Sequence, residues 1–492
     1  MTDHIRLPQE GERTMVLKGF EQRHLQGFVE ELILQHRVDV LYYITEFDTV
    51  ISPQVADRVQ VLPVNLLDKL PFLNWDRYLP IDAPLISRLK AVESIVMTMF
   101  ERSYAFHHSY IFRRRAYLQL LRFWNTIISQ GTFVGFVADI LPHAPIDHTL
   151  FGLCHELGLP KMYFDNLLPG FITVWHYWDQ TPQGLSPSQI HPAPDAVLSH
   201  RAELVLRSQT GQKGEAVPYY MDPTFWSVYQ KNAKARLRWR ILNKPRTAAE
   251  KRQLKSPAYL LLQAERYLKS KIRLPLKSWL LKQQLTSYSQ HVDPERVGRY
   301  LYVALHMQPE VSSGPRAGAY VDQHLIVEQL SACVPEDLIL IVKENPKQTG
   351  LYRDRYVYRD LSRLRNVVLV PKEQDTFDLI ANCLAIVTST GTVGWEGLFR
   401  GKPVLCFGYP FYQAAQGVRV VMTTEQVRRA IDDLVAGDWD LPDQGSTVDF
   451  LKTLDRVAIR GNLDGHREHL LPSPPGLLEE LHRAIDQQLA VE

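Results

Sequence analysis

One stretch decides the fold of this 492-residue chain: residues 384–407 read LAIVTSTGTVGWEGLFRGKPVLCF. The apolar run 384–387 predicts a buried strand, the small polar residues 388–392 a tight turn, and residues 393–400 a short helix. A glycine ends that helix, and residues 403–407 predict a second buried strand. Such a strand-helix-strand unit is the building block of an open parallel α/β sheet.

The turn of this unit has the composition of an anion site. The free amide groups and the positive dipole end of a helix start attract an oxyanion, and Ser389, Thr390 and Thr392 add hydroxyl groups. Gly391 lets the backbone approach a ligand closely. Because ligands of such sheets bind at the carboxyl ends of the strands, the turn predicts a phosphate or nucleotide site. The alternative is that these small residues only let a helix pack on the sheet.

Length and composition indicate a globular protein of about two domains. Hydrophobic residues make up 45% of the chain and charged residues 22%, which excludes a disordered or fibrous protein. No apolar run is long enough for a membrane span, and the N-terminus has no secretory pattern. The scattered cysteines lack metal-ligand spacing, which fits a reducing cytoplasm. They are Cys154, Cys333, Cys383 and Cys406.

A net charge of +2 hides a strong asymmetry. Residues 231–282 contain 16 lysines and arginines against two glutamates, a local balance of +14, so the rest of the chain carries about −12. A basic block of this kind is a solvated helical face, a contact for an anionic membrane surface or acidic acceptor, or a nucleic-acid site. Tryptophans and tyrosines lie there among leucines and no nucleic-acid motif is present. The sequence therefore favours the first two alternatives and predicts no nucleic-acid partner.

Strand-like and helical patterns divide the chain into four parts. Residues 1–200 and 296–435 predict two α/β, Rossmann-like domains, each with a mainly parallel sheet. Residues 201–295 predict a basic helical connector, and residues 436–492 a helical tail. The expected strands are 14–20, 38–44, 132–137 and 161–164 in the first domain, and 299–305, 338–343, 367–370, 384–387 and 404–407 in the second.

Polar loops follow the strands of the second domain at the edge where ligands bind. Gln308 follows the first strand, and Lys343, Asn345 and Lys347 lie at the end of the second. Pro346 stops that strand, so the lysines can turn their charge toward a phosphate. Together with the turn at 388–392, these loops predict one converging anion site.

The order of these motifs resembles the capsule polysaccharide biosynthesis family. The resemblance rests on Gln308-Pro309-Glu310, Lys343-Glu344-Asn345-Pro346, residues 388–396, 401–404 and 407–412; in the first domain it rests on residues 142–148. It covers about residues 299–420 well. It implies a GT-B type glycosyltransferase with two Rossmann-like domains that face a cleft. The donor would be a nucleotide sugar such as CMP-Kdo, which is a substrate and no cofactor, and the acceptor a growing glycan or a lipid-linked glycan.

The resemblance also implies roles for single residues. Lys343, Asn345, Ser389 and Thr390 would hold the donor phosphate, and Glu396 would bind the ribose. Gln308, Gly391 and Thr392 complete the predicted donor site. The family usually has His-Pro where this chain has Asn345-Pro346, so the donor sugar and its nucleotide stay open. No Asp-x-Asp pair stands where it would hold a cation, which predicts a metal-independent enzyme.

Sugar transfer also needs a base or nucleophile, which we expect from the first domain. His143, Asp147 and His148 follow the strand 132–137, at its carboxyl end. Asp147 also fits the start of a helix, where a carboxylate caps backbone amides. Other acidic candidates after strands are Glu46, Asp48 and Asp165. An aromatic run can stack on sugar rings or can be core packing; it consists of Phe171, Trp175, Tyr177 and Trp178.

Three other functions fit parts of the same pattern. A nucleotide-sugar epimerase shares the two facing domains but needs no acceptor. A polyol-phosphate transferase shares the phosphate site, and a non-catalytic polysaccharide assembly subunit would bind polymer without turnover. The basic connector favours an enzyme with an anionic acceptor, located in the cytoplasm and peripheral at the inner face of the membrane.

Overall fold

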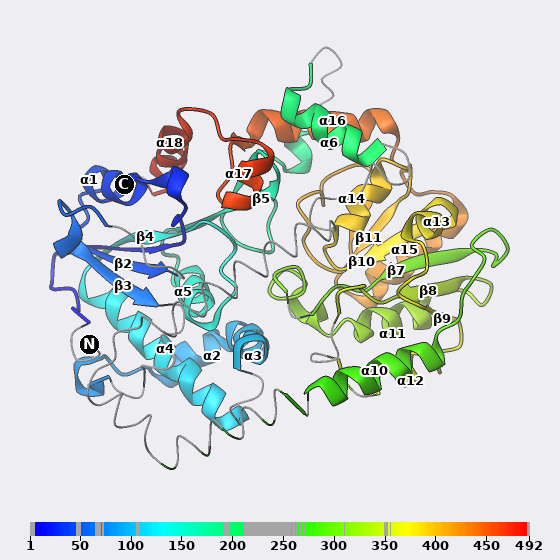
Figure 1. Ribbon diagram of the computed structural model, residues 1–492, viewed down its shortest axis with the longest axis horizontal. Helices are drawn as coiled ribbons and strands as arrows, with labels where there is room; N and C mark the ends of the chain where they lie inside the picture. Colours follow the sequence, from blue (N-terminus) through cyan, green and yellow to red (C-terminus); the bar gives the residue numbers. More distant parts are fainter. Residues whose placement is uncertain are drawn as a thin grey trace.

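The computed structural model describes most of the chain. It covers residues 5–45, 51–63, 70, 73–104, 109–190, 197–210, 274–308, 310–348, 353–354 and 356–489, with single positions between 257 and 272. Two sheets lie along the long axis of the molecule, each covered by helices on both faces (Figure 1).

The first sheet has seven strands, and its five parallel strands form the centre and one edge. The order is β13 (Ile459–Arg460), β6 (Phe171–Trp175), β5 (Lys161–Leu168), β4 (Thr132–Ala138), β1 (Arg13–Lys18), β2 (Val40–Thr45) and β3 (Val59–Pro63). β6 and β13 are antiparallel to their neighbours.

The second sheet has six strands, all parallel. The order is β12 (Val418–Val420), β11 (Val404–Cys406), β10 (Ala385–Thr388), β7 (Tyr300–Ala304), β8 (Ile339–Lys343) and β9 (Val367–Val370). All five strands predicted for this domain are present. The two sheets confirm the predicted α/β fold class with two Rossmann-like domains.

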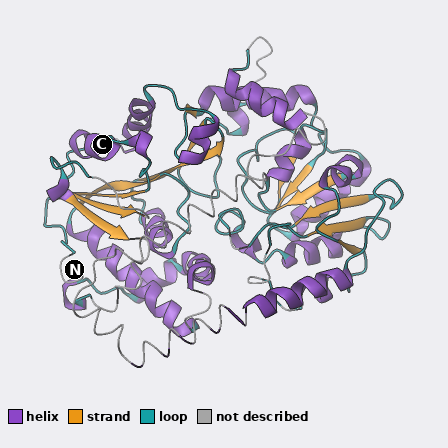
Figure 2. Cartoon of the chain, viewed as in Figure 1, coloured by secondary structure: helices purple, strands orange, loops and turns teal. Residues whose placement is uncertain are grey.

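Helices separate these strands in both sheets (Figure 2). Those of the first sheet are α1 (Phe28–Gln35), α2 (Ala83–Arg88), α3 (Lys90–Tyr104), α4 (Tyr110–Gln130) and α5 (Pro145–Glu156). Those of the second are α10 (Leu274–Tyr288), α11 (His324–Cys333), α12 (Val357–Leu361), α13 (Thr376–Asn382), α14 (Thr392–Leu398) and α15 (Thr424–Ala436). None of the helices in these described ranges is long and apolar enough to cross a bilayer.

Each sheet has a point where the chain reverses its direction of travel. In the second sheet the chain runs outward from β7 to β8 and β9 and then returns to β10, on the other side of β7. In the first sheet the same reversal lies between β1 and β4. Loops on the two sides of such a switch point diverge to opposite faces and leave a crevice for ligands at the strand ends.

The first strand is shorter than predicted. Residues 14–20 were expected as a strand, but β1 ends at Lys18 because Gly19 and Phe20 have φ angles of 82° and 63°. A side chain on Gly19 would collide with the Asp139 carboxylate, so the chain needs glycine here. The left-handed backbone turns the chain away from the sheet at the switch point.

The segment after residue 436 returns to the first sheet. It contains α16 (Gln444–Val457), α17 (Gly465–Leu470) and α18 (Leu477–Leu489). Between them β13 pairs with β6, and α18 packs on β4 and β5. Leu481, Ile485 and Leu489 are buried in the same core as β1 and β2. The predicted helical tail is therefore structurally part of the N-terminal half, next to α6 (His200–Thr210), which contacts α16.

Candidate functional site

The switch point of the second sheet joins a histidine and a threonine. His306 follows β7, and its Nε2 lies 2.6 Å from Oγ1 of Thr388 at the end of β10. The backbone N–H of Gly391 donates to the same hydroxyl over 3.1 Å. A Cβ on Gly391 would stand 2.7 Å from the His306 ring, so any larger residue at this position would displace the ring. The turn of residues 388–392 is thereby fixed against the loop after β7.

Burial keeps the His306 imidazole neutral. Burial lowers the pKa of His306 to about 4. The nearby charge of Arg353 also lowers this pKa, whereas that of Glu344 raises it. At neutral pH this ring is therefore a hydrogen-bond partner and carries no positive charge.

Ser389 and Thr390 have different environments. Ser389 is buried, and its Oγ has no hydrogen-bond partner among the described residues. Thr390 donates from Oγ1 to the carbonyl of Ser312 over 2.7 Å, which ties the turn to the loop after β7. A Cβ on Gly408, just after β11, would touch Thr390, so that loop also lies close. Of these two hydroxyls, that of Thr390 is used in a contact within the protein, and that of Ser389 has no partner among the described residues.

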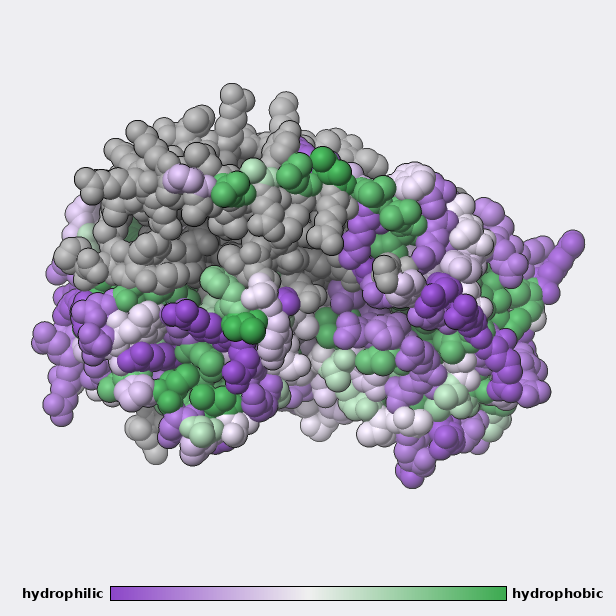
Figure 3. All heavy atoms as spheres, turned by 90° about the horizontal axis from the view of Figure 1, so that it is seen from below, coloured by the Kyte–Doolittle hydropathy of each residue, from purple (hydrophilic) through white to green (hydrophobic). Residues whose placement is uncertain are grey.

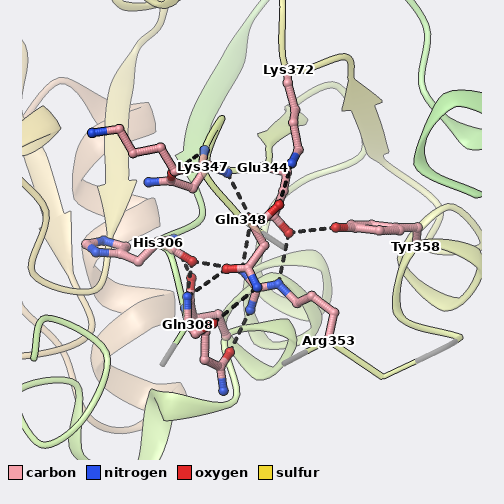
Figure 4. Close-up of polar contacts among 10 residues, drawn as sticks. His306, Gln308, Glu344, Lys347, Gln348, Arg353, Tyr358 and Lys372 are labelled. Atoms are coloured by element: carbon pink, nitrogen blue, oxygen red, sulfur yellow. Dashed lines mark hydrogen bonds and ion pairs between the residues drawn. The ribbon is translucent and has the colours of Figure 1, made fainter. Parts of the chain in front are cut away.

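A buried network holds the loop after β7 (Figure 4). The side-chain amide of Gln323 accepts from His306 N–H at 2.6 Å and donates to His306 C=O at 3.2 Å. The side chain of Gln348 makes the same pair of bonds with the backbone of Gln308, at 2.6 and 3.2 Å. Arg353 donates to the His306 carbonyl and to Oε1 of Gln308. The loop is therefore preorganised by side chains from three places: the start of α11, the turn after β8 and the residues just before α12.

Arg353 is neutralised by Glu344 at the end of β8. Both side chains are buried, and Arg353 Nε and Nη2 donate to the two carboxylate oxygens at 2.9 Å each. The Tyr358 hydroxyl donates to the same carboxylate at 2.8 Å. A bidentate, hydrogen-bonded pair of this kind makes up for the cost of burying both charges. Glu344 is thus a structural partner inside the Lys343–Pro346 motif.

Lys343 and Asn345 make contacts within the protein. Lys343 is buried, and its Nζ donates to Oγ1 of Thr376 at the start of α13 over 2.6 Å. Burial lowers the pKa of Lys343, against the attraction of Asp375. Oδ1 of Asn345 accepts from the backbone of Lys347 at 2.9 Å, which closes the turn at Pro346. Their predicted contacts with a phosphate stay predictions.

Glu396 and Thr392 lie on α14. Glu396 is half-buried, and its charge adds to burial in raising the pKa of the Tyr302 hydroxyl. This places the Glu396 carboxylate toward β7. Its predicted contact with a ribose stays a prediction.

A pocket of about 330 Å³ lies beside the loop after β7, with Leu305 and Gln308 among its lining residues. Gln308 and Arg353 form part of its wall, and four carboxylates line it. They come from α11 and α12 and from the residues just before these helices: Asp322, Glu328, Asp354 and Asp360. This acidic lining repels phosphate.

In the first sheet, Asp147 lies fully buried at the start of α5. Its Oδ1 accepts from Ala144 N–H at 2.7 Å, which is the helix-start role considered for it. Its Oδ2 lies 3.4 Å from Nζ of Lys18, the last residue of β1. Burial raises the pKa of Asp147, although the Lys18 ammonium opposes this. Lys18 and Asp147 thus join the two sides of the switch point.

The two neighbouring histidines differ in exposure. His148 is buried, its Nδ1 lies 2.9 Å from the Pro142 carbonyl, and burial lowers its pKa to about 4. His143 is half-buried, with Nδ1 2.7 Å from the Leu141 carbonyl. His143 is therefore the candidate of the three that reaches the protein surface. The alternatives Glu46 and Asp48 lie outside the described residues.

Loops at the carboxyl edges of the two sheets contact each other. Arg316, from the loop after β7, forms an ion pair with Asp165 of β5 and lies 4.9 Å over the Trp175 ring. Trp178 meets Tyr409, after β11, edge to face at 5.7 Å. The buried aromatic rings of Phe171, Trp175 and Tyr177 belong to the core, which is the packing alternative. Asp165 therefore has a role in joining the domains.

Three residues at these contacts were not recognised in the sequence: His306, Arg316 and Arg353. Each acts through a partner far away in the chain, such as Thr388 for His306 and Asp165 for Arg316. A local signal exists only for His306, which directly precedes the polar loop at Gln308. Among the described residues, no group of three or more histidines, cysteines and carboxylates is placed to hold a metal.

Residues 255–430 match the family model of capsule polysaccharide biosynthesis proteins. The resemblance found in the sequence is therefore confirmed over this segment, which includes the whole second sheet. No curated protein matches the chain.

Several solved structures show weak similarity. The calicheamicin glycosyltransferase CalG4 is 13% identical, with 98% of this chain and 100% of that chain covered and a TM-score of 0.22. KpsC of Thermosulfurimonas dismutans, a β-Kdo 2,7 transferase, is 16% identical over 36% of this chain and 57% of that one, with a TM-score of 0.21. UDP-GlcNAc 2-epimerase of Methanocaldococcus jannaschii is 9% identical over 89% and 97%, with a TM-score of 0.25. Scores this low do not separate transferase from epimerase.

Proposed function

We propose, from the family match over residues 255–430, that this protein is a glycosyltransferase that builds a surface or capsular polysaccharide or glycolipid. The observation that carries the proposal is the turn of residues 388–392 at the switch point, inside the matched segment. It presents a buried, unpaired Ser389 hydroxyl and the glycine of a helix start, where a donor phosphate can approach the backbone.

The proposed reaction needs no metal. The nucleotide phosphate leaves from the turn of residues 388–392, where the Ser389 hydroxyl and backbone amides stabilise its growing charge. The acceptor hydroxyl loses its proton to a group of the first domain. His143 is the candidate that reaches the surface, whereas Asp147 and His148 are buried.

Nucleotide release tests this proposal. The purified protein is incubated with CMP-Kdo, CMP-sialic acid, UDP-sugars and GDP-sugars, with and without an oligosaccharide acceptor. We expect one donor to release nucleotide, and release to increase with the acceptor. A donor that is converted to another sugar nucleotide without acceptor would indicate an epimerase. Transfer of an intact polyol phosphate would indicate a polyol-phosphate transferase. If the protein neither binds nor releases any of these nucleotides, the non-catalytic assembly subunit is the function that remains.

Replacement of Lys343 tests the phosphate assignment. We expect Lys343→Ala and Glu396→Ala each to weaken nucleotide binding by about tenfold, the effect of one charged contact of about 1.4 kcal/mol. Isothermal titration with the released nucleotide measures this. Lys402→Ala is the matched control, because Lys402 Nζ donates to the Cys383 carbonyl at the opposite edge of the same sheet. Unchanged affinity in Lys343→Ala would show that the phosphate assignment is wrong.

Asp147→Asn separates catalysis from donor binding. The amide keeps the shape of the side chain but lacks the charge that faces Lys18 at 3.4 Å. We expect turnover to fall by about tenfold or more with the donor affinity unchanged, because the group lies in the other domain. If kcat stays at the wild-type value, Asp147 is only a helix cap, and His143→Gln becomes the decisive variant.

A further inference from the structure

Helix α10 exposes an apolar stripe that faces away from the protein. Leu276, Trp279 and Leu280 are 53%, 55% and 52% exposed. Their spacing of i, i+3 and i+4 places them on one side of the helix. Leu281 and Leu285, on the opposite side, are buried against the second sheet. The helix is thus apolar on two faces, and the core explains only one of them.

Basic side chains flank this stripe. Lys277 and Lys282 lie between the exposed and the buried side of α10 at 3.6 residues per turn. The helix contains no aspartate or glutamate. Just before it, Leu268 and Ile272 are also more than half exposed. An apolar stripe with a tryptophan and flanking lysines is the pattern of a helix that lies in a membrane interface.

A second apolar and basic segment lies in the other half of the molecule. Helix α4 begins with Tyr110, Ile111 and Phe112, which are 57%, 78% and 40% exposed. Three arginines follow directly, of which Arg115 is exposed. The helix has no acidic residue along its 21 positions. Three consecutive exposed apolar side chains are unusual on a soluble surface and mark an interaction site.

Both segments lie on the same side of the molecule. Figure 1 shows α10 and the start of α4 along the lower side, one in each half. Figure 3 looks at this side and shows hydrophobic side chains next to strongly hydrophilic ones beside the grey residues. A bilayer is a flat partner that contacts both segments at once, and its anionic headgroups complement the basic side chains beside both apolar segments.

We propose that this lower side docks on an anionic membrane surface. The apolar side chains of α10 and of the first turn of α4 enter the boundary between headgroups and acyl chains, and the flanking lysines and arginines contact anionic headgroups. The proposal does not depend on the transferase activity, because it concerns a different side from the switch-point loops.

Vesicle sedimentation tests the docking surface with the full-length protein and no donor. We expect binding to vesicles that contain phosphatidylglycerol and little binding to pure phosphatidylcholine. Trp279→Ser combined with Leu280→Ser should weaken binding by about tenfold or more, because two apolar side chains that enter the membrane interface are lost. Ile111→Ser should weaken it independently. The matched controls are Leu34→Ser and Leu441→Ser, at exposed leucines of α1 and of the loop after α15.

Two outcomes would overturn the proposal. Wild-type binding in the Trp279/Leu280 variant would mean that basic residues elsewhere attract the lipid and that this stripe takes no part. The second outcome is seen by light scattering without vesicles. If the wild type is a dimer and the Trp279/Leu280 variant is a monomer, a second copy of the chain covers the stripe. Melting curves followed by circular dichroism confirm that each variant is folded, and nucleotide release with a short soluble acceptor shows whether the donor site is intact.

Discussion

At the scale of single residues, the candidate donor site depends on a neutral histidine. His306 makes two backbone bonds with Gln323 and one bond with the Thr388 hydroxyl. A charged imidazole would lie in a buried site next to the Arg353 guanidinium. The protein therefore keeps this ring uncharged at neutral pH, and acid disturbs it.

The stability of the protein should fall on acidification because of His306. The folded-state pKa is about 4 against an ordinary value of 6.5, so the unfolded chain binds the proton first as the pH falls. This loss begins near pH 6.5, is complete near pH 4, and amounts to at most about 3 kcal/mol. Urea unfolding at several pH values measures it. His306→Gln should be less stable than the wild type at pH 7, and the gap should narrow toward pH 4.5.

A substitution without a titratable group provides the control. Leu34→Ala, at a leucine that is 55% exposed, should differ in stability from the wild type by the same amount at every pH. If the gap for His306→Gln is also constant, the imidazole is not held neutral by its site.

Residue contacts of this kind could be predicted only in part. The sequence pointed to the turn of residues 388–392 and to the loops at Gln308 and Lys343, because glycine, proline and hydroxyl residues mark turns locally. It did not reveal that Thr390 bonds to Ser312 or that Asn345 closes its own turn. Such pairings depend on the distance between loops, which the fold decides.

At the scale of elements, the contact between the turn and β7 requires glycine at the start of α14. An added Cβ at Gly391 would lie 2.7 Å from the His306 ring and 2.8 Å from the Thr388 hydroxyl, both closer than real Cβ contacts. The φ angle of Gly391 is −74°, so alanine can adopt the backbone and the collision alone decides the effect.

Gly391→Ala should therefore leave the fold intact and weaken nucleotide binding. We expect a loss of about tenfold or more in affinity and a cost of about 1 to 3 kcal/mol in stability from overpacking. Titration calorimetry and urea unfolding give the two numbers. Gly445→Ala, in the first turn of α16, is the control, because its Cβ would meet only an Asp443 oxygen at 3.3 Å. If both variants bind the nucleotide with equal affinity, the turn of residues 388–392 is not part of the donor site.

Long apolar strands were the most predictable elements. The five expected strands of the second sheet are all present, and so is the helix expected at residues 477–489. β3, β6, β12 and β13 were not expected. β6 was considered only as an aromatic run, and the two-residue β13 becomes a strand only by pairing with β6. Short edge strands have little sequence signal of their own.

At the scale of the whole molecule, the two halves contact each other through loops at the carboxyl ends of their strands. Arg316 and Asp165 connect the carboxyl edges, and the segment from β13 to α18 completes the first sheet. A Cβ on Gly135 of β4 would meet Leu489 at 2.7 Å, so α18 packs directly on the strand. The division into residues 1–200, 201–295, 296–435 and 436–492 stays a prediction in its exact boundaries.

Truncation of Leu481 should destabilise the first sheet, although this residue is distant in the sequence. Its side chain is fully buried with β1 and β2, and Leu481→Ala removes it at a cost of about 2 to 5 kcal/mol. Hydrogen exchange of the amides in β4 and β5 should become faster, while those of β8 and β10 keep their protection. Leu34→Ala, at a leucine that is 55% exposed, should change neither. Faster exchange in β8 would mean that the two sheets unfold as one unit.

The return of β13 and α18 to the first sheet affects the order in which the protein can be made. A ribosome delivers β4, β5 and β6 before the second sheet, but the residues that cover them emerge only after that whole sheet has been made. Until residues 459–489 are translated, β6 keeps a free edge and the core side of β4 stays open to solvent. A nascent chain interrupted before residue 459 therefore presents an uncovered sheet to chaperones and proteases, whereas a chain translated through residue 489 closes it.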